Sequence, residues 1–186
     1  MQGFDFSSSI FSPVITVPPS AKIIFVSDLF VEDYVGGAEL TSEALIKTSP
    51  FEVFKLKSRD VTMDLLKTGA DRFWVFGNFA ELNPNLIPSI IGNLRYSVLE
   101  YDYKYCRARS PEKHLDVTGL PCDCAGQVSG KLISAFYYGS MGIWWMSEAQ
   151  QQRYLTMFPF LADKTNVVLS SVFSRETLDR IDALRQ

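Results

Sequence analysis

Short apolar runs alternate with segments of helical spacing along most of this chain. Six runs have the length and residue types of β-strands: 22–28, 51–57, 71–78, 95–105, 142–147 and 165–171. Six segments carry the spacing or boundary residues of helices: 37–48, 60–69, 83–93, 129–141, 148–158 and 174–186. Because apolar strands alternate with helices, the pattern predicts an α/β fold, a three-layer Rossmann-like parallel sheet with helices on both faces.

The two parts of the chain differ in character. Residues 1–20 are rich in serine and proline and lack helical spacing, so we expect an extended N-terminal arm. Residues 21–186 are expected to form one Rossmann-like domain, because a chain of this length buries about 70% of its unfolded surface without needing disulfides. The helical pattern runs to the last residue, where we expect the edge of this domain. Within the domain, residues 106–129 have little periodicity, and we expect a long loop there.

Composition and charge narrow the class of protein. The chain is 47% hydrophobic and 21% charged, which is typical of a globular protein. Its net charge of −3 argues against a nucleic-acid-binding surface. No run reaches the roughly 18 consecutive apolar residues of a membrane span, and the N-terminal sequence does not resemble a secretory signal. An odd number of cysteines then favours reduced thiols or a metal site, and we expect a cytoplasmic protein.

A loop with two adjacent glycines, Gly36 and Gly37, joins the first predicted strand to the first predicted helix. Ligands of open parallel sheets bind at the carboxyl ends of the strands, where loops meet helix N-termini. Glycine lets the backbone approach a ligand, and a helix N-terminus favours an anion such as a diphosphate. The loop has neither a P-loop nor a G-x-G-x-x-G pattern, which weakens the case for NAD. The alternative is a plain tight turn into the helix.

The residues around this loop resemble a known family. The strand "KIIFVSDLF", followed by a loop and by "GGAEL" at a helix start, resembles the N-terminal domain of the retaining GT-B glycosyltransferases. The later stretch "IWWMSEAQQQRYLTMFP…NVVLSSVFS" is also similar to that family, and the likeness covers about residues 22–180. The resemblance implies that Gly36 and Gly37 lie beside the donor diphosphate. It also implies that the chain is the acceptor-side domain of an enzyme transferring a sugar from a nucleotide-sugar donor to an acceptor.

Two features depart from the family pattern. Many members carry a histidine near the end of the fourth strand, where this chain has Glu100 and Asp102. The family also binds the donor mainly through a second Rossmann domain with an E-x7-E segment, and these 186 residues contain no such domain. We therefore expect half an enzyme, whose partner is a C-terminal Rossmann domain in a longer or separate chain. The alternatives are a stand-alone α/β binding or assembly module without catalysis, and another nucleotide-binding Rossmann protein.

Several polar or small residues follow predicted strands and so are expected at the ligand-binding edge. The candidates for catalysis are Asp28, Glu100 and Asp102, although retaining members of the family show no clear protein nucleophile. Gly77, Asn78 and Ser147 are candidate cleft-lining residues, since each follows a strand; Ser147 is also the expected cap of the next helix.

All three cysteines and the only histidine fall within one short segment: Cys106, His114, Cys122 and Cys124. Three thiolates and one imidazole are the ligand set of a closed, tetrahedral, structural zinc site. Such a site would explain how an aperiodic segment stays ordered. Two alternatives remain: unlinked thiols beside a surface histidine, or a disulfide from Cys106 to Cys122 or Cys124.

The same segment carries four cations in an otherwise acidic chain: Lys104, Arg107, Arg109 and Lys113. These side chains could contact a phosphate or an anionic acceptor. The alternative is a solvated loop face.

Overall fold

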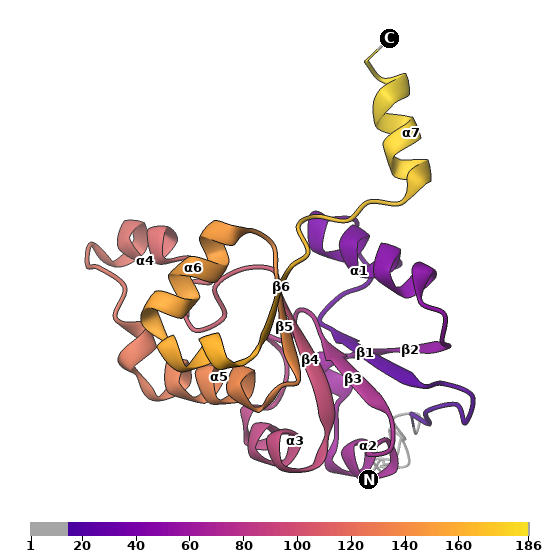
Figure 1. Cartoon of the computed structure of the whole chain (residues 1–186), viewed down its shortest axis with the longest axis horizontal. Coiled ribbons are helices and arrows are strands. Elements are labelled where there is room, and N and C mark those ends of the chain that lie inside the picture. Colours follow the sequence, from indigo (N-terminus) through magenta and orange to yellow (C-terminus); the bar gives the residue numbers. More distant parts are fainter. Residues whose placement is uncertain (1–14, 186) are drawn as a thin grey trace, which may run out of the picture.

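A single six-stranded parallel sheet forms the centre of the computed structural model, which describes residues 15–185 (Figure 1). Its strands are β1 (Ile23–Ser27), β2 (Val53–Lys57), β3 (Phe73–Phe76), β4 (Arg95–Glu100), β5 (Gly142–Trp145) and β6 (Thr165–Val168). They lie in the order β2-β1-β3-β4-β5-β6, and every neighbouring pair is parallel. The predicted α/β, Rossmann-like fold with a parallel sheet is confirmed.

The helices agree with the predicted segments, apart from one. They are α1 (Gly37–Thr48), α2 (Met63–Thr68), α3 (Ile87–Asn93), α4 (Pro111–Thr118), α5 (Val128–Gly139), α6 (Glu148–Met157) and α7 (Arg175–Ala183). Short 3-10 turns lie at Ser58–Asp60, Pro84–Leu86, Cys124–Gly126 and Pro159–Asp163. The expectation of an unstructured loop over 106–129 was therefore wrong, because α4 lies within it. None of the described helices is long and apolar enough to cross a membrane.

Helices cover both faces of the sheet, as Figure 1 shows with α1 on one side and α2, α3 and α5 on the other. Successive side chains of a strand point to opposite faces. Phe25, Val75 and Leu99 accordingly form a small core with α1, while the alternate positions join the larger core with α2, α3, α5 and α6. Trp145 is fully buried in the larger core, and Trp144 packs against the smaller one. The adjacent tryptophans thus serve opposite faces.

An aromatic cluster fills the larger core. The ring of Phe136 on α5 stacks on Tyr96 at 4.9 Å and meets the edge of Phe76 at 5.2 Å between ring centroids. The Tyr96 hydroxyl donates a hydrogen bond of 2.6 Å to the carbonyl oxygen of Phe136, which satisfies a buried polar group. Burying each of these side chains contributes about 1.5–3 kcal/mol. This cluster fixes α5 against β3 and β4.

The strand predicted over 95–105 ends early, at Glu100. The Oε1 atom of Glu100 accepts hydrogen bonds from the backbone N–H groups of Asp102 and Lys104, at 3.1 and 3.4 Å. These bonds turn the chain away from the sheet directly after β4. Asp102 therefore lies in a loop rather than in the strand.

The two ends of the described chain add little to this core. Residues 1–14 of the predicted N-terminal arm lie outside the described residues. Ile15 and Val17 have no regular secondary structure and pack, partly buried, against the larger core. At the other end, α7 extends away from the sheet, and none of its residues is buried (Figure 1).

Candidate functional site

The four candidate metal ligands come from three neighbouring pieces of the chain. Cys106 lies in the loop after β4, His114 lies on α4, and Cys122 and Cys124 lie in the connection that leads into α5. The short helix that carries His114 has clear boundaries. The hydroxyl of Ser110 caps it by accepting a bond from the N–H of Lys113 at 3.1 Å, and Gly119 ends it in the left-handed region at φ 68°.

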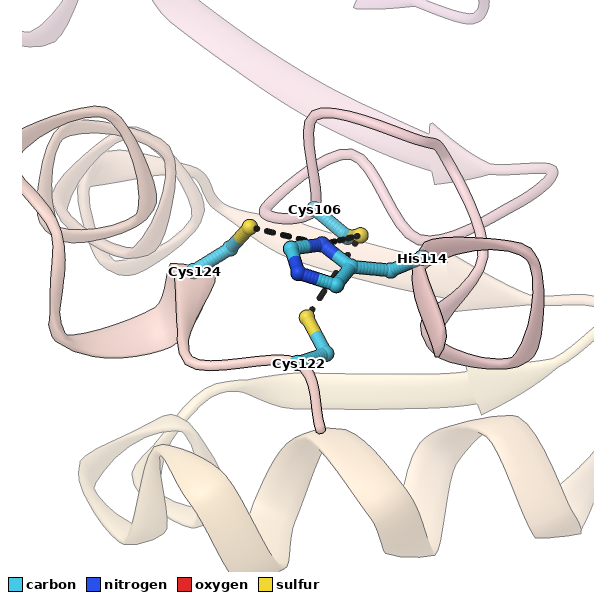
Figure 2. Close-up of side chains that lie close together, drawn as sticks. All are labelled: Cys106, His114, Cys122 and Cys124. Carbon is cyan, nitrogen blue, oxygen red and sulfur yellow. Dashed lines mark hydrogen bonds between the residues drawn. The ribbon is translucent and has the colours of Figure 1, made fainter. Parts of the chain in front are cut away.

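The side chains of the four candidates converge on one point, as Figure 2 shows. Their ligand atoms all lie within 4.8 Å of one another. The Nδ1 atom of His114 is 3.4 Å from Sγ of Cys124 and 3.7 Å from Sγ of Cys106, and the sulfurs of Cys106 and Cys122 are 3.5 Å apart. All three cysteines are free.

These distances match a tetrahedral metal site. In a tetrahedral zinc site, metal–sulfur bonds are about 2.3 Å long and a metal–nitrogen bond is about 2.05 Å long. With this geometry, two sulfur ligands lie about 3.8 Å apart, and a sulfur and a nitrogen ligand lie about 3.6 Å apart. Three of the six separations, at 3.4–3.7 Å, lie close to these values, and all six are within 4.8 Å. The Cys3His cluster could therefore bind a metal ion with small movements of its side chains.

Most of this cluster is buried, which is unusual for polar side chains. Cys106, His114 and Cys124 are buried, and Cys122 is half-buried. Burial, together with the neighbouring sulfurs of Cys106 and Cys124, raises the pKa of the Cys122 thiol to about 12. A cation among the sulfurs reverses this effect, since a coordinating thiol loses its proton to the metal's charge.

A buried ionic network follows β4 and contains two of the predicted catalytic residues. Glu100 is fully buried, and the ammonium of Lys104 lies 3.4 Å from its Oε1 and 3.5 Å from Oδ1 of Asp102. Arg109 donates to Asp102 at 2.8 Å and to the amide oxygen of Asn78 at 3.3 Å. The network thus brings Glu100, Asp102 and Asn78 together.

The two carboxyl groups of this network titrate differently. Burial raises the pKa of Glu100 to about 8, although Lys104 acts in the opposite direction. The second oxygen of Glu100 has no hydrogen-bond partner among the described residues, as suits a neutral carboxyl group. Burial would also raise the pKa of Asp102, but Lys104 and Arg109 hold it below its usual value. At neutral pH, Asp102 therefore carries the negative charge of the pair.

Asp28, the third catalytic candidate, holds loops together at the same edge of the sheet. Its carboxylate accepts hydrogen bonds from the hydroxyl of Ser58 and from the backbone N–H groups of Ala80 and Glu81, the last two at 3.0 and 3.1 Å. These contacts tie the end of β1 to the loop after β3. The geometry gives Asp28 a structural role, and its catalytic role stays a prediction.

The two predicted glycines differ in their surroundings. A Cβ atom on Gly36 would meet the carboxylate of Glu39 at 2.6 Å and the ring of Tyr34 at 2.7 Å. A Cβ atom on Gly37 would meet nothing within 4 Å. Packing within the chain therefore explains a glycine at position 36 but gives no reason for one at position 37.

The remaining candidates lie close to the ionic network. A Cβ atom on Gly77 would approach the rings of Phe25 and Tyr101 at 3.2 and 3.4 Å. Ser147 caps α6 by accepting from the N–H of Gln150 at 3.1 Å, and the Gln150 side chain donates to the carbonyl oxygen of Asp102 at 2.9 Å. The sequence prediction missed Gln150, although the S-x-x-Q pattern of a capping box marks its position.

Comparison of the chain with protein-family models, with curated proteins and with solved structures gives no match. The interpretation of this site therefore rests on its own geometry and chemistry.

The raised pKa of Glu100 predicts a pH-dependent stability. The native state holds a proton on this group that the unfolded state releases above about pH 4.5, so native stability falls as the pH rises from there. The contribution of this proton is fully lost above about pH 8, where stability stops changing with the ionisation of Glu100. Replacing Glu100 with Gln should remove this dependence, which is on the order of a few kcal/mol at most. Denaturant titrations of both proteins at about pH 6 and about pH 9 measure it.

Glu112 provides the control for this measurement. Its exposed carboxylate accepts hydrogen bonds that lower its pKa, so Glu112→Gln should leave the change between the two pH values as in the parent. If Glu100→Gln loses as much stability on going to the higher pH as the parent does, the raised pKa is wrong.

Proposed function

We propose that this chain is the acceptor-side domain of a GT-B glycosyltransferase. A C-terminal Rossmann domain, in the same or a separate chain, supplies the main contacts to the nucleotide-sugar donor. The reaction is transfer of the sugar to an acceptor bound largely by the present domain. Two things support this proposal: the "GGAEL" segment resembles that family, and the segment lies at a suitable position in the fold.

Support comes first from the sheet topology. The chain moves from β1 outward to β2 and then returns to β3 on the other side of β1, so the strand order reverses between β1 and β3. Open α/β sheets bind ligands in the crevice beyond such a reversal, at the carboxyl ends of the strands. Gly36 and Gly37 follow β1, and Gly77 and Asn78 follow β3. The predicted diphosphate-binding and cleft-lining residues thus flank the expected crevice.

The observation that carries the proposal is the open start of α1. No side chain caps this twelve-residue helix, and the space around Gly37 is free. Its first N–H groups and its dipole favour an anion at this end. A diphosphate can approach from the side of Gly37, where nothing lies within 4 Å of an added Cβ atom, and not from the side of Gly36, where the carboxylate of Glu39 lies.

We further infer that the metal of the Cys3His cluster is zinc and that its role is structural. Three thiolates and an imidazole complete a four-coordinate shell and leave no open position for substrate or water. Thiolate ligands select soft or borderline metals over magnesium or calcium. The proposal places the protein in the cytoplasm, where thiols stay reduced and available to the metal.

The diphosphate contact predicts a specific loss of binding. The chain alone should bind a nucleoside diphosphate weakly, since one glycine loop offers few contacts. Replacing Gly37 with Val should abolish this binding by blocking the approach to the helix start, while the fold stays intact because the added atoms meet open space. Titration calorimetry with UDP and GDP measures the affinity.

The matched control is Gly92→Val on α3, where an added Cβ atom also meets nothing within 4 Å. It should bind as the parent does. Equal nucleotide binding by the Gly37→Val variant and the parent would mean that the loop is only a turn.

The zinc assignment predicts about one equivalent of metal in the purified protein and its loss to a strong chelator. Cys122→Ser should mimic the chelator, because three remaining ligands hold zinc far less tightly. Hydrogen exchange should increase over residues 106–129 and stay low in the strands, whose core forms without that segment. Elemental analysis and exchange mass spectrometry test both statements.

Asp123→Asn is the control, since this exposed residue lies between two ligands but donates no ligand atom. It should keep the metal. The proposal fails if protein purified without chelators carries no metal and all three thiols of the folded chain react freely.

A further inference from the structure

A cavity of about 380 Å³ lies beside the metal cluster. Its walls come from four parts of the chain: the loop after β3, the start of α3, the loop after β4, and the first turns of α5. Its volume falls within the range of about 300–1,000 Å³ that is usual for small-molecule sites. Neither the metal cluster nor the glycine loop accounts for this space.

Most of the wall is apolar. Phe79 and Leu82 line it from the loop after β3, and Leu132 and Ile133 line it from α5. Phe79 and Leu82 are buried, so this wall belongs to the larger core. An apolar group is therefore the part of a ligand that this wall can accept.

All the charged residues of the wall are cations. Lys104, Arg107 and Arg109 line the cavity, and no carboxylate does. Lys104 is only 7% exposed, and its ammonium lies 5.3 Å from the centroid of the Phe79 ring. Arg109 is held by Asp102, whereas Arg107 is exposed and forms no ion pair with any residue of the described part of the chain. The free guanidinium of Arg107 is available to an anion.

The start of α5 also favours an anion in this cavity. Ser129, in the first turn of this twelve-residue helix, lines the cavity, and no side chain caps the helix start. Its uncapped N–H groups therefore favour an anion on the same side as the three cations.

We propose that this cavity binds a small molecule that joins an apolar group to a phosphate. The apolar group packs against Phe79, Leu132 and Ile133. The phosphate binds Arg107, whose planar guanidinium suits phosphate oxygens, with the α5 N-terminus behind it. This site is separate from the glycosyltransferase proposal, because it uses neither the glycine loop nor a sugar donor.

The metal cluster and the cavity share a wall. Cys106, a metal ligand, also lines the cavity, and it lies between Lys104 and Arg107 in the chain. A bound metal therefore fixes the segment that presents the cations, which reduces the cost of ordering them when the ligand binds.

Calorimetry of the full metal-loaded chain with three probes tests this proposal: 1-naphthyl phosphate, 1-naphthol and inorganic phosphate. The first probe has both the apolar group and the phosphate, and each of the others has only one of them. We expect 1-naphthyl phosphate to bind at least about tenfold more tightly than either of the others. If 1-naphthyl phosphate binds no more tightly than 1-naphthol or inorganic phosphate, the proposal is overturned.

Two substitutions locate the site. Arg107→Gln should weaken the binding of 1-naphthyl phosphate about tenfold and leave the binding of 1-naphthol unchanged. The control is Arg95→Gln, since Arg95 is exposed and lies at the opposite end of β4; this variant should bind both probes as the parent does. Ala80→Trp, at an exposed position of the cavity wall, should weaken both naphthyl probes by filling the space. Parent-like binding of 1-naphthyl phosphate by Arg107→Gln or by Ala80→Trp overturns the proposal, because the probe then binds elsewhere.

Discussion

All six strands run in the same direction, and the rest of the molecule depends on this constraint. A parallel sheet must be covered on both faces, which places α1 on one side and the aromatic core with α2, α3, α5 and α6 on the other. It also brings the carboxyl ends of all strands to one edge. The glycine loop after β1, the Asn78 loop after β3 and the ionic network after β4 therefore meet there, although they are far apart in the sequence.

The loops at this edge are held by polar contacts rather than by a core of their own. Asp28 joins three segments through hydrogen bonds, and the Glu100, Asp102 and Lys104 network turns the chain after β4. The connection from 106 to 127 is farther from the sheet and has few buried apolar side chains. Its side chains Cys106, His114, Cys122 and Cys124 are buried or half-buried, and their ligand atoms lie within 4.8 Å of one another. A metal ion bound there would supply a cross-link that apolar packing does not.

Local pattern in the sequence was enough for the strands, for six of the helices and for grouping the four candidate metal ligands. Each depends on residue type and spacing along the chain. The helix α4 was missed because only His114 of its eight residues is buried, so it has no apolar stripe; its signals were the cap Ser110 and the terminal Gly119. The partners of Asp28 and Glu100, and the cavity beside Cys106, could not be predicted, since they depend on contacts between distant segments.

X-ray absorption spectroscopy at the zinc edge tests the central claim most directly, because it reports the atoms bound to the metal in the folded protein. Three sulfur ligands at about 2.3 Å and one nitrogen ligand at about 2.0–2.1 Å are expected for a closed site made by the three thiolates and His114. A shell with fewer than three sulfurs, or one completed by water or carboxylate oxygens, would contradict the account of a structural metal that cross-links the connection from 106 to 127.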